Sequence, residues 1–188
     1  MSDPEGAARR PRYTTAPLPP YSYVSGFAPH PVSDPRGHLH GAPHLTPPAL
    51  APADWQASHA YRRGVDLFNH GYYWEAHEQW ESLWLAGGRT GPVAVWLKAL
   101  IKLAAAGVKA REGNAAGAER HARRSLELAG ELRRELPVGV ATYCGMQFSR
   151  IEGAARAIAD AAPTAFIRPQ PELLLGEWLE LKSTASER

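Results

Sequence analysis

The sequence predicts an all-α protein, a compact bundle of about five helices joined as antiparallel hairpins, with an irregular proline-rich N-terminal arm packed on it. Apolar residues recur at helical spacing in five segments between residues 54 and 161, separated by Gly, Asn and Pro stop signals. The 188 residues, 44% of them hydrophobic, suffice for one domain with a sizeable core plus extensions. We therefore expect an arm at residues 1–53, a helical core domain at 54–162 and a C-terminal extension at 163–188.

The arm holds most of the prolines and shows neither a helical nor a strand period. Aromatic and aliphatic side chains are interleaved with these prolines, and such side chains let an extended chain pack across a folded body. They are Tyr13, Tyr21, Tyr23, Val24, Phe27 and Leu39. Ordered wrapping is therefore the expectation, with a solvated tail as the alternative.

The first three helices follow from caps and stops. Asp54 is the expected N-cap of a helix that runs to about Asn69, where Asn69-His70-Gly71 makes a tight stop. A second helix ends at Gly87-Gly88, and Pro92 starts a third, because proline is favoured at the first helical position. This third helix continues to about Arg111 with apolar residues around most of its circumference, so it should be central.

Two more helices complete the predicted bundle. The fourth follows Gly113-Asn114 and runs to about Glu135, with small residues in line that allow close helix approach. After an irregular stretch, Ser149-Arg150-Ile151-Glu152 matches a capping box for a fifth helix ending near Ala161. The last segment is expected to be extended, with a short helical turn around Trp178.

Composition narrows the function classes. A net charge of +2 is too near neutral to favour nucleic acid, and the arginines gather on the fourth helix as a solvated face. A single cysteine, Cys144, excludes an internal disulfide and a cysteine-rich zinc site and fits a reducing cytoplasm. No run approaches the roughly 18 apolar residues of a membrane span, and the N-terminus lacks a signal-peptide core. We expect a soluble cytoplasmic protein with neither nucleic acid nor membrane as a partner.

Residues 67–84 set ionisable groups among large aromatics. On a helix with about 100° per residue, the apolar residues share one broad arc that includes His77 and Glu81, with Glu78 at its edge. The solvent side should carry Tyr72, Glu75, Gln79 and Ser82. Burying an unpaired charge costs several kcal/mol, so His77 and Glu81 should pair with each other, with a cation or with a metal.

A metal would explain these residue types. His77 and Glu81 stand at i and i+4, a spacing that can chelate a divalent ion from one helix, as in His-Glu-x-x-His but with Glu81 replacing the second histidine. Mixed nitrogen and carboxylate ligands suit zinc, iron or manganese, although at least one further ligand is needed. Glu78 would then act as general base toward a bound water, which makes hydrolysis the natural reaction and His77, Glu78 and Glu81 the candidate catalytic residues.

The arm offers further ligands. His30, Asp34 and His38 are closely spaced among prolines, and if the arm lies over the second helix they would complete a metal site with His77 and Glu81. The alternative is that these histidines only decorate the surface.

A second hypothesis assigns no chemistry to the cluster. In it His77 and Glu81 hydrogen-bond each other, or Glu81 pairs with Lys98 or Lys102, as a structural buried polar network. The protein would then be a non-enzymatic helical scaffold or a protein-interaction module. The sequence leaves open whether it is an enzyme, and whether its partner is a small molecule or a protein.

One long motif stands out, Phe68-Asn69-x-Gly71-x-Tyr73-Trp74-Glu75-Ala76-His77-Glu78-x-Trp80-Glu81-x-Leu83-Trp84. It resembles the signature of the bacterial and plant domain of unknown function 309 family. With two later blocks, the likeness covers about residues 55–135. The family pattern often has glutamine and glycine where this chain has Lys98 and Ala99. The resemblance implies a small all-helical bundle, and the family has no settled activity.

Overall fold

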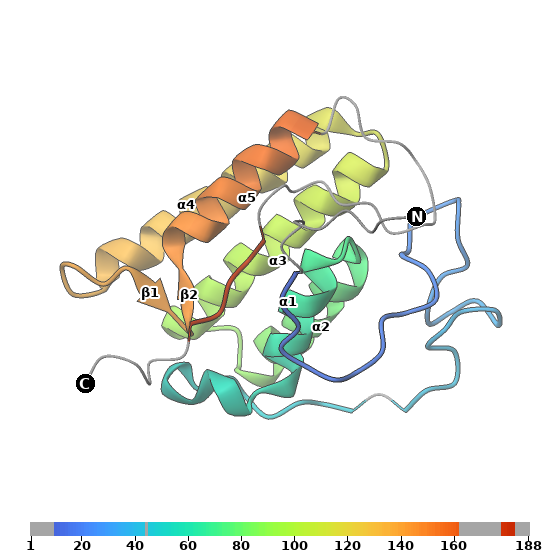
Figure 1. Ribbon diagram of the computed structural model, residues 1–188, viewed down its shortest axis with the longest axis horizontal. Coiled ribbons are helices and arrows are strands. Elements are labelled where there is room, and N and C mark those ends of the chain that lie inside the picture. Colours follow the sequence, from blue (N-terminus) through green and yellow to red (C-terminus); the bar gives the residue numbers. More distant parts are fainter. Residues whose placement is uncertain (1–9, 44, 162–177, 183–188) are drawn as a thin grey trace, which may run out of the picture.

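The computed structural model describes residues 10–43, 45–161 and 178–182, and it confirms the all-α bundle (Figure 1). The elements in chain order are a 3-10 helix η1 (Pro52–Ala57), α1 (His59–Asn69), α2 (Tyr73–Ala86), α3 (Gly91–Arg111), α4 (Ala115–Glu135), strands β1 (Thr142–Tyr143) and β2 (Met146–Gln147), and α5 (Phe148–Ala161).

The helix boundaries follow the predicted stop signals except at α1. Gly71, Gly88 and Gly113 each adopt a positive φ between successive helices, a conformation that favours glycine. The start of the first helix was wrong: Asp54 lies inside η1, and α1 begins after Ser58. Ser58 caps α1 because its side chain accepts a hydrogen bond from the Tyr61 backbone N at 3.3 Å.

A small hairpin replaces the irregular stretch expected before α5. β1 and β2 pair antiparallel, and the turn residues Cys144 and Gly145 have φ values of 46° and 73°, as a two-residue hairpin turn requires. Because α5 begins at Phe148, directly after β2, Ser149 lies within the helix and the predicted capping box is wrong.

The described C-terminal residues are extended. Leu181 forms an isolated antiparallel bridge with Met146 of β2, and Trp178 itself is not helical, whereas the part of the predicted turn before Trp178 lies outside the described residues. The rest of the expected extended piece lies outside the described residues.

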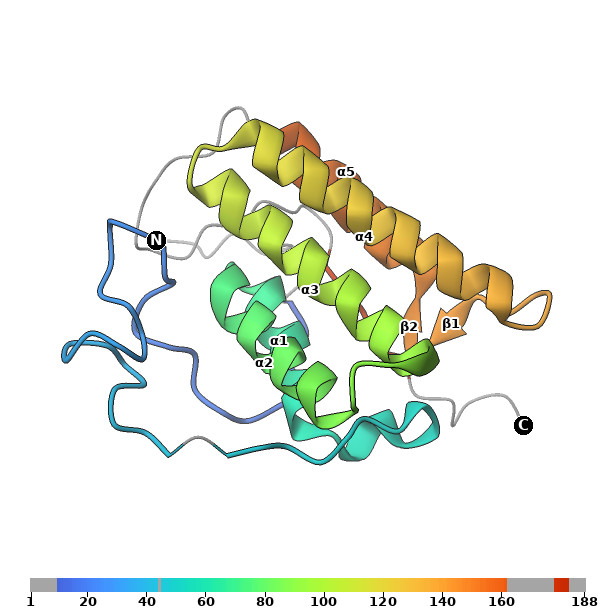
Figure 2. The same ribbon diagram turned by 180° about the vertical axis from the view of Figure 1, so that it is seen from behind.

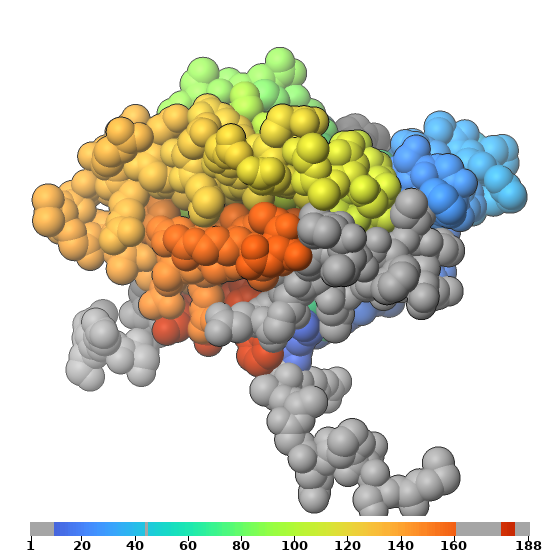
Figure 3. All heavy atoms as spheres, turned by 90° about the horizontal axis from the view of Figure 1, so that it is seen from above, coloured from blue at the N-terminus to red at the C-terminus, as the bar shows by residue number. Residues whose placement is uncertain are grey.

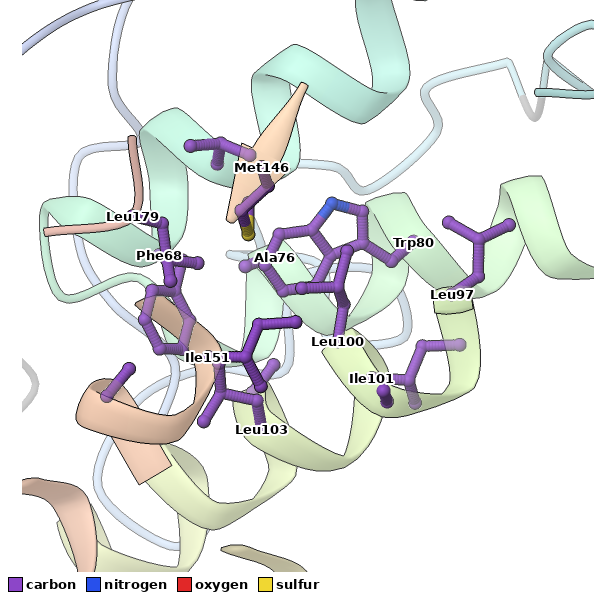
Figure 4. Packing of buried hydrophobic residues seen from close by; sticks show 14 of the residues in the cluster. Phe68, Ala76, Trp80, Leu97, Leu100, Ile101, Leu103, Met146, Ile151 and Leu179 are labelled. Atoms are coloured by element: carbon purple, nitrogen blue, oxygen red, sulfur yellow. The ribbon is translucent and has the colours of Figure 1, made fainter. Parts of the chain in front are cut away.

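The hydrophobic core surrounds α3. This helix runs between the α1/α2 hairpin and the α4/α5 pair (Figure 2). Large apolar side chains from α1, α2, α3 and α5 meet in its middle (Figure 4). They include Phe68, Trp80, Leu100, Leu103 and Ile151. The described part of the chain has one helix that is long and apolar enough to cross a membrane, α3, and 56% of its apolar window is buried inside the bundle.

Two glycines let the helices cross closely. A Cβ at Gly64 of α1 would lie 2.3 Å from Nε1 of Trp80, and a Cβ at Gly107 of α3 would lie 2.5 Å from Cγ of Tyr73. Side chains at these positions would overlap the aromatic rings, so the hairpin packing depends on glycine.

The outer face of the bundle, formed by α4 and α5, carries ion pairs between arginine and glutamate side chains. α4 and α5 lie side by side on the face shown in Figure 3. On α4, Arg124 contacts Glu127 at 2.9 Å and Glu131 at 3.1 Å, and Arg123 pairs with Glu119. These exposed pairs agree with the predicted solvated arginine face.

The described part of the arm packs on α1 and α2, as expected (Figure 1, blue). Asp66 of α1 is fully buried and holds the beginning of the arm. Its Oδ1 accepts a hydrogen bond from the Tyr13 backbone N at 2.7 Å. Its Oδ2 accepts from the backbone N and the hydroxyl of Thr14, at 2.9 and 2.6 Å, and lies 3.3 Å from Nε of Arg12. Further along, the Ser22 hydroxyl donates to the Gly71 carbonyl at 2.9 Å.

Asn69 ties the C-terminal residues to α1. Its side-chain amide donates to the Leu179 carbonyl at 2.8 Å and accepts from the Leu179 backbone N at 2.8 Å, and both residues are buried. We expect Asn69→Ala to lower the free energy of unfolding by about 2 kcal/mol, because it leaves two buried backbone groups without partners. Urea denaturation measures this loss, and a change below about 0.5 kcal/mol would contradict the assignment.

Candidate functional site

The candidate site lies on α2, one turn into the helix. Nδ1 of His77 is 3.3 Å from Oε1 of Glu78 and 3.9 Å from Oε2 of Glu81. One potential ligand atom from each residue falls within 4.8 Å of the others. Among the described residues, this is the one group of three or more histidine, cysteine or acidic side chains close enough to share a metal ion.

The cluster is half-exposed, which corrects the expectation that it is held out of water beneath aromatics. The side chains of His77, Glu78 and Glu81 are 25%, 42% and 41% exposed. The buried face of α2 is narrower than the predicted arc, since Trp84 is itself partly exposed and Leu85 is exposed. Because these side chains are partly solvated, burial does not require them to have an ion-pair or metal partner. The argument for a metal site therefore rests on the distances between them.

The structure does not bring the predicted arm ligands His30, Asp34 and His38 into the cluster. None of the three belongs to the cluster around His77. His30 packs against the Trp74 ring, with centroids 5.3 Å apart, and its Nδ1 accepts backbone hydrogen bonds within the arm.

The other two arm residues are also engaged locally. Asp34 pairs with Arg36 at 2.9 Å, and this hydrogen bond lowers the pKa of Asp34 to about 2. His38 packs edge-on against Tyr21, and burial lowers the pKa of its imidazole. The arm does reach α2, but it covers the side of the helix that carries Trp74 and Glu75, away from His77.

Sequence reasoning missed the carboxylate that α2 does bury. Glu75, expected on the solvent side, is only 4% exposed because the arm covers it. Its Oε1 accepts a hydrogen bond from the Tyr23 backbone N at 2.9 Å. Burial raises the pKa of Glu75 to about 7, against the lowering effects of that hydrogen bond and of the Arg111 charge. The one sequence signal for the burial of Glu75 is the set of aromatic residues in the arm, which predicts that the arm packs on the helices.

A small cavity adjoins the cluster in the groove between α2 and α3. Its volume is about 130 Å³. It is lined by His77, Glu81, Trp84, Lys98, Ile101 and Lys102. Nζ of Lys98 lies 5.0 Å from the centre of the Trp84 ring. Within the described part of the chain, Glu81 forms no ion pair with Lys98 or Lys102, so the predicted pairing of these groups is not observed.

The donor set suits a divalent cation. Metal–ligand bonds of about 2.0–2.2 Å in a tetrahedron place ligand atoms about 3.4 Å apart. The separations of 3.3 Å between His77 and Glu78 and 3.9 Å between His77 and Glu81 bracket this value, and all three atoms lie within 4.8 Å of one another. One imidazole and two carboxylates are ligands for zinc, iron or manganese, and the adjoining cavity leaves room for water or a substrate.

Comparison with known proteins gives one match. Residues 61–121 match a family described as Domain of unknown function (DUF309), which confirms the resemblance seen in the sequence. The matched stretch runs from α1 into α4 and includes His77, Glu78 and Glu81. Neither a curated protein nor a solved structure matches the chain.

Proposed function

We propose, for a chain whose residues 61–121 match the DUF309 family, that His77 and Glu81 bind one divalent metal ion beside Glu78, which acts as general base, and that this site supports hydrolysis of a small substrate. The observation that carries this proposal is the convergence of three potential ligand atoms within 4.8 Å beside a cavity. Two of the three residues, His77 and Glu81, also line the cavity, so a bound ion would face its contents.

The chemistry follows from the positions. A bound divalent ion lowers the pKa of a coordinated water and polarises a substrate oxygen. His77 and Glu81 hold the ion at the cavity wall, whereas Glu78 lies outside the cavity lining. Glu78 is the residue that we assign to proton uptake from the attacking water.

Calorimetric titration of untagged protein with Mn²⁺ or Zn²⁺ tests the proposal. We expect one ion per chain in the wild type and affinity at least about tenfold weaker in His77→Ala, because a ligand is lost. His59→Ala is the matched control, since His59 is an exposed histidine at the start of α1. If neither the wild type nor the variants bind a stoichiometric ion, the proposal fails.

The alternative is a helical scaffold or interaction module in which the cluster is purely structural. The contact between His77 and Glu78 at 3.3 Å favours the structural role, because this contact forms without a metal. The exposure of both side chains weighs against it, since exposed ion pairs contribute only about 0–1 kcal/mol. A large loss of melting temperature in His77→Ala, independent of added metal, would favour the scaffold over the metal site.

A further inference from the structure

We infer that the cavity beside the cluster receives the phosphate group of a small phosphorylated molecule, between Lys98 and Lys102 on one side and an ion at His77 and Glu81 on the other. This inference rests on the proposed metal site and names the class of its substrate.

Two lysines that form no ion pair with any described residue carry the inference. Lys98 and Lys102 are one turn apart on α3 and both line the cavity. Among the described residues neither has an acidic side chain within salt-bridge distance. Lys109, further along the same stripe of α3, behaves differently, because its Nζ pairs with Glu112 at 2.6 Å. Within the described ranges, the cavity therefore faces two ammonium groups that form no ion pair with a carboxylate, and the one carboxylate in its lining is the proposed metal ligand Glu81.

One more cation lies near the cavity. Arg89, in the turn after α2, lies against the Trp84 ring, 5.4 Å from the ring centre. His121 of α4 adds no charge at neutral pH, because burial, followed by the charges of Lys102 and Lys109, lowers the pKa of its imidazole. A concave surface with an excess of one charge concentrates ligands of the opposite charge.

Charge balance indicates a dianion. A divalent ion cancels the two carboxylates of Glu78 and Glu81, and the ammonium groups of Lys98 and Lys102 then remain as the net charge of the site. A phosphate monoester carries about −1.5 to −2 at pH 7, which matches that charge. Lysine binds phosphate as a point charge, and a metal ion polarises a phosphoryl oxygen.

The cavity size limits the ligand. Pockets for drug-sized ligands measure about 300–1,000 Å³, whereas this one measures about 130 Å³. It therefore has room for a compact charged group, while the organic part of the ligand lies outside, where the partly exposed Trp84 ring offers an apolar wall.

The reaction implied by this ligand is hydrolysis of a phosphate monoester. The water oxygen forms a bond to phosphorus and the ester P–O bond breaks. One water proton passes through Glu78 to the leaving oxygen, and the other stays on the released phosphate. No further reactant is needed.

The test uses the untagged full chain loaded with Mn²⁺ and titrated calorimetrically with inorganic phosphate, phenyl phosphate and malonate. We expect both phosphates to bind more tightly than malonate. The double variant Lys98→Gln/Lys102→Gln should bind phenyl phosphate about tenfold or more weakly, because two charged contacts are lost. Lys109→Gln is the matched control and should bind as the wild type does. Lys109→Gln should keep the wild-type affinity for Mn²⁺, and the double variant should bind Mn²⁺ no more weakly than the wild type, because it removes two positive charges beside the ion.

The outcomes separate the two proposals. If Mn²⁺ binds but phosphate does not, or if the double variant binds phenyl phosphate as well as the wild type, the inference fails and the metal site stands. Tighter binding of malonate, or binding of free phosphate without phenyl phosphate, also overturns it. If Mn²⁺ does not bind, the inference and the proposed function fail together.

Discussion

Replacing Asp66 with alanine is expected to release the beginning of the arm and to lower the free energy of unfolding by about 3–5 kcal/mol. Asp66 is fully buried, and its two oxygens accept three hydrogen bonds from Tyr13 and Thr14 and lie beside the Arg12 guanidinium. Hydrogen bonds to a charged group contribute about 1.5–3 kcal/mol each. Removing the carboxylate also leaves the Arg12 charge without this counter-charge in a partly buried position.

Urea denaturation and hydrogen exchange together check this expectation. Backbone amides of the described arm residues should exchange faster in Asp66→Ala, while those of α3 keep their protection relative to global unfolding. Asp66→Asn should lose less stability, because it keeps one oxygen acceptor. Asp54→Ala is the control, since Asp54 is an exposed carboxylate in η1. An arm that stays protected in Asp66→Ala would show that other contacts hold it.

The second large effect is a pH dependence that originates at Glu75. Burial raises the pKa of this carboxyl from 4.5 to about 7 in the folded protein, so the folded state binds a proton more tightly than the unfolded state does. Stability from this group is therefore fully present below about pH 4.5 and is lost as the pH rises through about 7. The loss amounts to about 3 kcal/mol, at 1.36 kcal/mol per pKa unit. The charge of Arg111 opposes the shift and that of Glu78 increases it.

Glu75→Gln tests this directly, because the amide is neutral at every pH and keeps an oxygen that can accept from the Tyr23 backbone N. Free energies of unfolding measured from pH 4 to pH 8.5 should converge for variant and wild type at the acid end. At the alkaline end the variant should be more stable. Glu135→Gln, at the exposed end of α4, should follow the wild-type curve. Parallel curves for Glu75→Gln and the wild type would refute the assignment.

Helices α2, α3 and α4 could be predicted from the sequence because their limits are set locally. Glycines with positive φ at Gly71, Gly88 and Gly113 separate them, and Pro92 occupies the first turn of α3. The hairpin before α5 was missed because each of its strands has only two residues, too few to show an alternating pattern. The Cys144-Gly145 turn was the one local sign of it.

The candidate site could be predicted only in part. The spacing of His77, Glu78 and Glu81 on one helix guarantees their proximity, and the structure brings them together. The burial of the α2 side chains was predicted wrongly, because a helical wheel does not include contacts with the arm. The arm segment at Tyr23 covers Glu75, whereas Glu81 faces an open groove. The lysines of the cavity depend on how α2 and α3 cross, which helical spacing alone does not determine.

The hydrogen bonds of Asp66, Asn69 and Glu75 set a lower limit on the length of chain that can fold by itself. All three residues lie inside the matched stretch 61–121, but the described partners of their side chains lie at residues 12–14, 23 and 179, outside it. An isolated 61–121 fragment would lose these hydrogen bonds and expose the three side chains, with the apolar surface around them, to water. The stretch that matches the family is thus shorter than the part of the chain that packs together, and a fragment chosen for expression should include residues 12–23 and 179.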